Sequence, residues 1–94
     1  MTAYVIARVT VTDPEAYKAY AARTVASAAT FGGVFRAKGG TQEILEGTAP
    51  ERHVLIEFPS AGAARAWYDS AEYQQLRTIA LAASTRDLVI VEGV

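Results

Sequence analysis

The spacing of apolar residues changes several times along this chain, and the order of those changes constrains the fold more than any other feature. Segments rich in β-branched or alternating apolar residues are typical of strands, and four occur: residues 3–11, 34–40, 52–58 and 86–92. Residues 14–30 carry apolar side chains at spacings of three and four, as an amphipathic helix does. Residues 61–68 and 71–83 repeat that pattern in two pieces. The predicted order is strand, helix, strand, strand, helix, strand.

Local signals predict where the helices begin and end. Asp13 can accept backbone N–H bonds as an N-cap, and Pro14 suits the first helical position because its missing N–H costs nothing there. Gly32-Gly33 can end the first helix, since glycine adopts the left-handed conformation that follows a last turn. Ser60 and Ser70 are expected to cap the two later helical pieces.

The middle of the chain is predicted to form a hairpin. A strand begins at Val34, and a bulge is expected at Gly39-Gly40, after which the strand resumes in residues 41–46. Residues 47–50 supply turn chemistry before the return strand at 52–58.

The predicted element order is that of an α+β, ferredoxin-like sandwich, an antiparallel sheet with its helices on one face. With 94 residues and no linker or internal repeat, we expect one domain over residues 1–94.

One face of such a sheet is left uncovered. Strict alternation places both apolar and charged side chains on it: Tyr4, Ile6, Val34, Leu55, Arg8, Arg36, Lys38, His53 and Glu57. A monomer that exposed so much contiguous apolar surface would risk association. A second copy that stacks its own sheet against this one would bury both patches. We therefore predict a homodimer with the sheets face to face.

Six segments, taken in order, resemble the family known as domain of unknown function 1330, within the dimeric α-β barrel superfamily: TDPEAY, FGGVFRAKGG, ILEG, PERHVLIEFPS, AWYDSAEYQ and RDLVIVEG. The resemblance covers nearly the whole chain. It implies a ferredoxin-like fold and a face-to-face dimer. Relatives in the wider superfamily include cofactor-free oxygenases of aromatic compounds, isomerases, haem-degrading enzymes and lyases, many with a pocket between sheet and helices.

Composition excludes several classes of function. Nine basic and ten acidic residues are interleaved along the chain, so no basic stripe exists for nucleic acid. Cysteine is absent, and one histidine without clustered carboxylates falls short of a metal site, so we expect no metal and no cofactor. The start lacks the pattern of a signal peptide, and no segment has the apolar length of a membrane span. A cytoplasmic location is the expectation.

Aromatic residues are the first candidates for a ligand site. Trp67 and Tyr73 lie on helical stripes that face the apolar side of the sheet, and Tyr20 lies on the inward stripe of the first helix. Core packing is one interpretation. The wall of a pocket is the other, because a buried indole or phenol needs a polar partner and the many alanines leave room nearby. Trp67 and Tyr20 are therefore candidate ligand-binding residues.

Charged residues of the uncovered face are the second group of candidates. His53 is the only histidine and could act as a general acid or base oriented by Glu57, four residues away on the same strand face. Arg8 and Arg36 could hold a substrate carboxylate near Glu57, or these charges could pair with one another in a dimer interface.

Two functional hypotheses remain open from the sequence. The first is a homodimeric domain that binds a small organic ligand without turnover, either in a pocket between sheet and helices or at the dimer interface. The second is a cofactor-independent oxygenase, isomerase or lyase that acts on a small aromatic or carbonyl compound. It would use His53 as the acid or base, Arg8 or Arg36 to stabilise negative charge, and Trp67 as a stacking wall.

Overall fold

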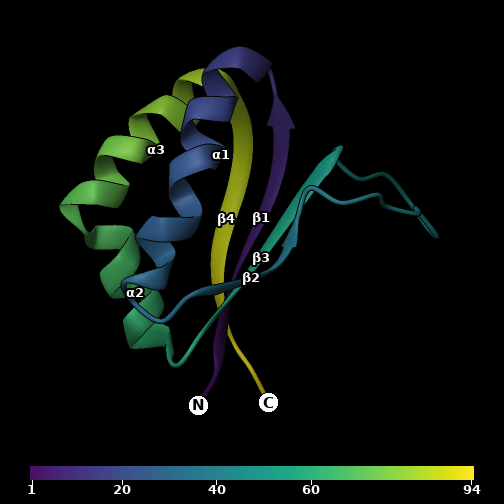
Figure 1. The fold of residues 1–94 in the computed structure, drawn as a ribbon. Helices are drawn as coiled ribbons and strands as arrows, with labels where there is room; N and C mark the ends of the chain where they lie inside the picture. The colour runs from purple at the N-terminus through teal and green to yellow at the C-terminus, as the bar shows by residue number, and fades with distance from the viewer.

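A computed structural model describes residues 1–94 as one four-stranded sheet with helices packed on one side (Figure 1). The elements in chain order are β1 (Ala3–Val11), α1 (Pro14–Ala29), β2 (Val34–Lys38), β3 (Arg52–Phe58), α2 (Ala61–Asp69), α3 (Ala71–Ala83) and β4 (Ser84–Glu92). The strands are arranged β2-β3-β1-β4, and all neighbours are antiparallel. The predicted α+β, ferredoxin-like class is confirmed, with an open sheet.

The predicted helix caps are also confirmed. The Asp13 carboxylate accepts the Ala16 N–H at 3.2 Å, and the Ser60 and Ser70 hydroxyls each accept a first-turn N–H of the helix that follows. Helix α1 ends one residue before the predicted boundary, and Gly32 then adopts φ +80°. Because these side chains satisfy the donors that a helix start leaves open, short helices are stabilised where they begin.

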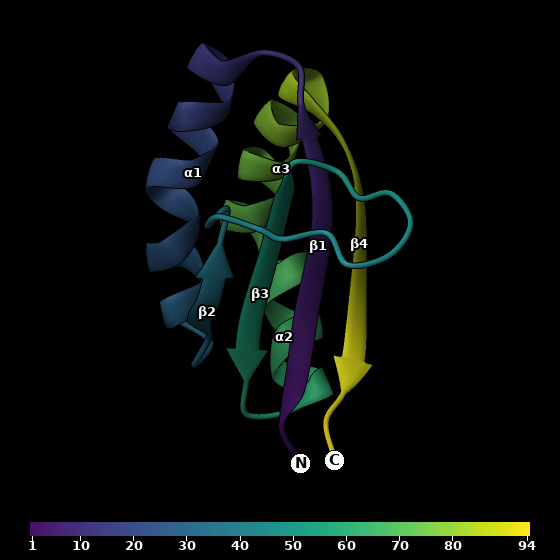
Figure 2. The ribbon, with the colours of Figure 1, turned by 90° about the vertical axis from the view of Figure 1, so that its right-hand side faces the viewer.

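Two predictions about the hairpin were wrong. Residues 41–46 form no strand, and the whole segment between β2 and β3 is a loop that projects from the side of the sheet opposite the helices (Figures 1 and 2). The register shift lies between Phe35 and Ala37 and not at Gly39-Gly40. Gly39 instead turns the chain out of β2 with φ +70°, a conformation that favours glycine. The glycine pair predicted as a bulge therefore lies at a turn.

The core lies between the helices and one face of the sheet. Every second residue of β1 from Ala3 to Val9 is buried there, as are Val54, Ile56 and Phe58 of β3. The helices contribute Trp67, Tyr73, Leu76 and smaller side chains. Strand β4 starts two residues earlier than predicted, at Ser84. None of the helices is both long and apolar enough to cross a membrane.

No helix lies on the opposite face of the sheet, which we call the uncovered face, although the loop between β2 and β3 passes in front of it in Figure 2. It carries apolar side chains from all four strands, among them Tyr4, Ile6, Val34, Leu55, Val89 and Val91. Half of the Val89 side chain is exposed, at 50%, and Val34 and Val91 are similar. Lys38 was predicted on this face, and that prediction was wrong. The extra residue in β2 turns Lys38 toward the helices, where its Nζ donates to the Ala21 carbonyl at 3.1 Å.

Candidate functional site

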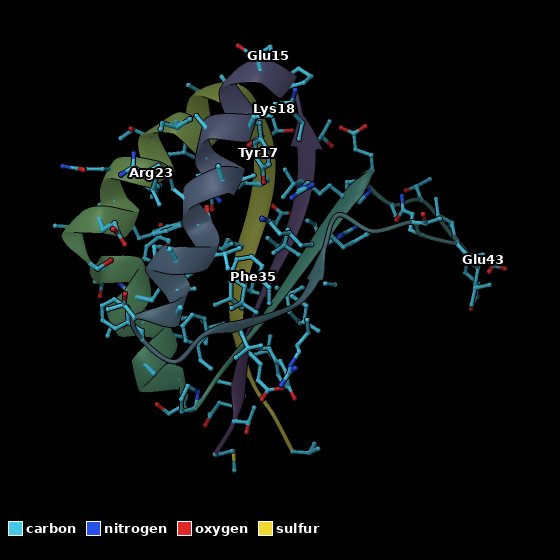
Figure 3. The ribbon with its side chains drawn as sticks, in the orientation of Figure 1. Glu15, Tyr17, Lys18, Arg23, Phe35 and Glu43 are labelled. Carbon is cyan, nitrogen blue, oxygen red and sulfur yellow. The ribbon has the colours of Figure 1, made fainter.

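A cavity lies between α1 and the helix-facing side of the sheet, and we call it the α1–sheet cavity. Its lining residues come from α1, α2 and all four strands: Ala7, Tyr17, Tyr20, Ala21, Thr24, Phe35, Lys38, Arg52, Val54, Ile56, Trp67, Arg86 and Leu88. The volume open to the centres of water-sized molecules is about 20 Å³, which is room for about one or two waters. Figure 3 shows Tyr17 and Phe35 in the space between α1 and the sheet. A larger ligand therefore requires side chains at the mouth to move.

Two arginines reach the cavity because of the strand register. Arg52 of β3 and Arg86 of β4 are both cross-strand partners of Val9, whose side chain faces the core. Directly opposed residues share a face of the sheet. Arg52, Val9 and Arg86 therefore form one row across three strands, on the side that the helices cover.

Each arginine lies against a tyrosine of α1. The Arg86 guanidinium donates from Nη1 to the Tyr20 hydroxyl at 3.1 Å and lies 5.5 Å from the ring centroid. The Arg52 guanidinium lies 5.2 Å from the centroid of Tyr17. Arg52 Nε is buried and has no hydrogen-bond partner. Such a group costs about 1–3 kcal/mol when its hydrogen bond is left unmade.

Gly39 makes room for this arrangement. A Cβ atom at position 39 would overlap the Arg52 guanidinium. The Gly39 N–H donates to the His53 carbonyl at 2.9 Å, so the backbone here is held close to β3. A glycine at the end of β2 is thus needed for Arg52 to lie over the cavity.

A pair of phenols extends the polar contacts into the core. The hydroxyls of Tyr20 and Tyr73 are hydrogen-bonded at 2.8 Å. Burial, followed by the neighbouring Tyr20 phenol, raises the pKa of Tyr73 well above its usual range, and burial likewise raises the pKa of Tyr17. For Arg86, burial acts to lower the pKa, but attraction to Tyr20 and Tyr73 outweighs it and the pKa is raised. At neutral pH the site therefore combines protonated phenols with a cationic arginine.

The structure supports both interpretations of Trp67, as a core residue and as part of a cavity wall. Its side chain is 1% exposed and packs 4.1 Å from the Tyr73 ring, centroid to centroid. Its Nε1–H donates to the Ser27 hydroxyl at 3.1 Å, and that hydroxyl donates to the Thr24 carbonyl at 2.7 Å. Trp67 is thus a core residue whose polar group is satisfied within the protein, and it also lines the α1–sheet cavity.

The charged candidates lie on the uncovered face, away from this cavity. His53 Nε2 is hydrogen-bonded to Gln42 Oε1 at 2.8 Å, and Glu57 pairs with Arg36 at 3.4 Å. The structure therefore does not bring His53 and Glu57 together as an acid–base pair.

Arg8 is separate from the Arg36–Glu57 pair. It is exposed and lies opposite His53, whereas Glu57 lies opposite Tyr4, four residues further along the ladder. At the usual rise per residue that separation is about 13 Å. Of the three predicted partners, only Arg36 and Glu57 meet.

Sequence reasoning missed the cations that line the cavity. The signal for Arg52 was its parity with Val54 and Ile56, which places a charge on the apolar face of the strand. Arg86 has the same relation to Leu88. Both residues are the first of their predicted strands, and a charged residue is ordinary at a strand end because it can reach solvent there. Tyr17 was placed on the inward stripe of the first helix but was not identified as a site residue.

Comparison with known families gives a match over almost the whole chain. The family described as "Domain of unknown function (DUF1330)" matches residues 2–94. No curated protein matches the chain.

Several solved structures share the fold at low sequence identity. A protein of unknown function from Rhodopseudomonas palustris is 18% identical with a TM-score of 0.81, over 99% of this chain and 82% of that chain. A dimeric ferredoxin-like protein of unknown function from Jannaschia sp. CCS1 is 14% identical with a TM-score of 0.81, over 99% of this chain and 100% of that chain. SnoaB, a cofactor-independent oxygenase from Streptomyces nogalater, is 19% identical with a TM-score of 0.73, over 99% of this chain and 93% of that chain. These likenesses show the fold.

Proposed function

The chain belongs to the DUF1330 family, and we propose that it binds a small organic ligand in the α1–sheet cavity. The observation that carries this proposal is the buried Arg52 Nε without a hydrogen-bond partner, in the wall of a cavity that is otherwise largely aromatic and aliphatic. Binding sites for small molecules typically combine apolar walls with a few convergent polar groups. A ligand oxygen that accepts from Arg52 would recover the cost of that unmade bond.

Entry to the cavity would occur between α1 and β2. Strand β2 has only five residues and pairs on one side alone, and the register shift interrupts that pairing. The Lys38 Nζ bond to the Ala21 carbonyl links the strand to α1. Phe35 at this edge is half-buried. Rotation of its side chain would enlarge the cavity without disturbing β1 or β3.

Native mass spectrometry of the protein purified without added ligand tests the proposal. We expect a reproducible adduct that is lost at higher activation energy. A matched pair of variants locates it: Ala21→Phe places a ring at the cavity, and Ala22→Phe places the same ring on the exposed side of α1. The adduct should disappear in the first variant and persist in the second. An adduct that survives equally in both would place binding elsewhere.

We also propose that the protein is a homodimer through the uncovered face of the sheet. Support comes from the exposed apolar side chains of that face and from the dimeric ferredoxin-like protein of Jannaschia. Val89→Glu would bury a carboxylate in the interface and should give a monomer by light scattering. Leu81→Glu, at an equally exposed apolar position on α3, should leave the dimer intact. A monomeric wild-type protein would contradict the proposal.

A cofactor-independent enzyme acting on a small aromatic or carbonyl compound is the second candidate. The observation that favours it is the Arg86–Tyr20 hydrogen bond at the cavity, because a cation and a phenol together can stabilise an enolate oxygen that develops during a reaction. The test is incubation of the protein with the compound identified by mass spectrometry, in air and without air. Recovery of the compound unchanged under both conditions would favour binding alone. His53→Ala should abolish turnover if His53 is the acid or base, and it should leave turnover unchanged if the reaction occurs in the α1–sheet cavity.

A further inference from the structure

The charges around the α1–sheet cavity are all of one sign. Lys38, Arg52 and Arg86 line it, and no aspartate or glutamate does. The three ion pairs of the chain use other cations, namely Lys18, Arg36 and Arg65. The cavity is therefore lined by cations that form no ion pair with a carboxylate of the chain.

The partners that these cations do have are neutral. Lys38 Nζ donates to a backbone carbonyl, and Arg86 donates to the Tyr20 hydroxyl. Arg52 lies over the ring of Tyr17. Because burial holds the pKa of Tyr17 above its usual range, that phenol does not supply negative charge at neutral pH. Lys38 is exposed, whereas Arg52 and Arg86 are partly buried. A partly buried cation with a neutral partner favours an anion that brings full charge compensation.

Neither of the carboxylates next to these arginines in the sequence forms an ion pair with them. Glu51 precedes Arg52, and its Oε1 accepts the Val11 N–H at 3.1 Å. Asp87 follows Arg86 and faces the other side of the sheet, since successive strand residues alternate. The alternation that turns both arginines toward the helices thus turns Asp87 out.

The lining of the cavity changes from charged to apolar along the strands. The row of Arg52, Val9 and Arg86 lies at one end. The next row toward the other end of the sheet is Val54, Ala7 and Leu88, and its central alanine leaves the most room. Ile56 and Phe35 follow, and Trp67 of α2 lines the same cavity. A ligand that fits this order has a charged head and a flat apolar body.

We propose that the α1–sheet cavity selects organic anions, with a carboxylate or enolate oxygen between Arg52 and Arg86 and an apolar ring over Ala7. This inference rests on the proposed function, because it names the chemical class of the ligand for the same cavity. Both guanidiniums can present N–H groups to one anionic head, since their strands lie on either side of β1. The Tyr20 hydroxyl, held by Arg86, adds a neutral contact beside that head.

Matched acids and amides test the inference by calorimetry on the purified protein. The pairs are acetate with acetamide, benzoate with benzamide, and 2-naphthoate with 2-naphthamide, so that each pair differs in charge and hardly in shape. We expect at least one acid to bind about tenfold or more tightly than its amide, because a charge-assisted bond replaces a neutral one. Added salt should weaken the binding of the acid and leave the binding of the amide unchanged.

Two charge-matched variants complete the test. Arg86→Gln should reduce the acid-to-amide ratio to about one, whereas Arg23→Gln should preserve it, because Arg23 lies on the outer side of α1 (Figure 3). Arg52→Gln provides a second variant at the cavity if Arg86→Gln does not fold. Equal binding of an acid and its amide would overturn the anion preference and leave ligand binding standing. Failure of every acid to bind would also overturn it, and the native mass experiment would then decide separately whether any ligand occupies the cavity.

Discussion

Replacing Ser27 with alanine removes the only polar partner that the structure gives to the indole of Trp67. The Ser27 hydroxyl accepts from Trp67 Nε1 at 3.1 Å, and both side chains are 1% exposed. A buried donor left unsatisfied costs about 1–3 kcal/mol. We expect a loss of about 2 kcal/mol in the free energy of unfolding, equivalent to a fall of about 10 °C in Tm for a domain of this size.

A double-mutant cycle isolates the hydrogen bond from other effects of the substitution. Trp67→Phe removes the donor, so Ser27→Ala in that background should cost about 1–2 kcal/mol less than it does in the wild-type protein. The gain in helix propensity from serine to alanine occurs in both backgrounds and cancels. Urea denaturation followed by far-UV circular dichroism measures all four proteins, at one protein concentration because a dimer's stability depends on it.

The cycle has a clear adverse result. If Ser27→Ala costs the same with tryptophan or phenylalanine at position 67, the coupling is zero and the indole is not held by Ser27. Trp67 would then be free to turn its N–H toward the cavity, as the ligand-site interpretation of this residue requires. A coupling of the expected size keeps Trp67 as a fixed wall against which a ligand packs.

Three further predictions concern the backbone, the helix cap and the phenols. Gly33→Ala should lower the free energy of unfolding by about 1–3 kcal/mol, because a Cβ would lie 2.8 Å from the Phe58 ring, and Gly40→Ala, with nothing within 4 Å, is the matched control in the same denaturation assay. Asp13→Ala should cost about 1 kcal/mol through loss of the N-cap bond, and urea midpoints that do not move would exclude that role. The raised pKa of Tyr73 means that the folded state holds this proton more tightly than the unfolded state, whose pKa is near 10.0. The stabilisation of the folded state that comes from this difference in pKa is thus present in full below about pH 10, and it is lost as the pH rises further. Denaturation between about pH 8 and pH 11 should show a smaller loss for Tyr73→Phe than for the wild-type protein.

Local chemistry explains why most of the fold could be predicted from the sequence. The caps at Asp13, Ser60 and Ser70 act within three residues of themselves, so the sequence alone contains the whole interaction. Alternation along β1 likewise depends on nothing but strand geometry. The segment 41–46 was mistaken for a strand because Ile44 and Leu45 are apolar. Both are exposed and lie in a loop, where the sheet offers them no partner strand.

The candidate site was harder to predict because it depends on how strands align. Tyr20 and Trp67 were identified from helical spacing, and both line the cavity. Arg52 and Arg86 lie 34 positions apart in the sequence and meet only because each is paired with Val9. That pairing is set by the register between strands, and the sequence of a single strand does not reveal it.

The bulge in β2 shows how one residue can determine the composition of the cavity. Val34 and Phe35 pair with Glu57 and Ile56, so plain alternation would set Arg36 opposite Leu55 and Lys38 opposite His53, on the uncovered face. The observed shift sets Ala37 opposite Leu55 and Lys38 opposite Val54, on the helix side. Lys38 thereby becomes the third cation of the cavity and joins β2 to α1, while Arg36 stays outside and pairs with Glu57. Because a bulge changes the face of every later residue in its strand, the contribution of Lys38 to the positive charge of the cavity depends on this single irregularity.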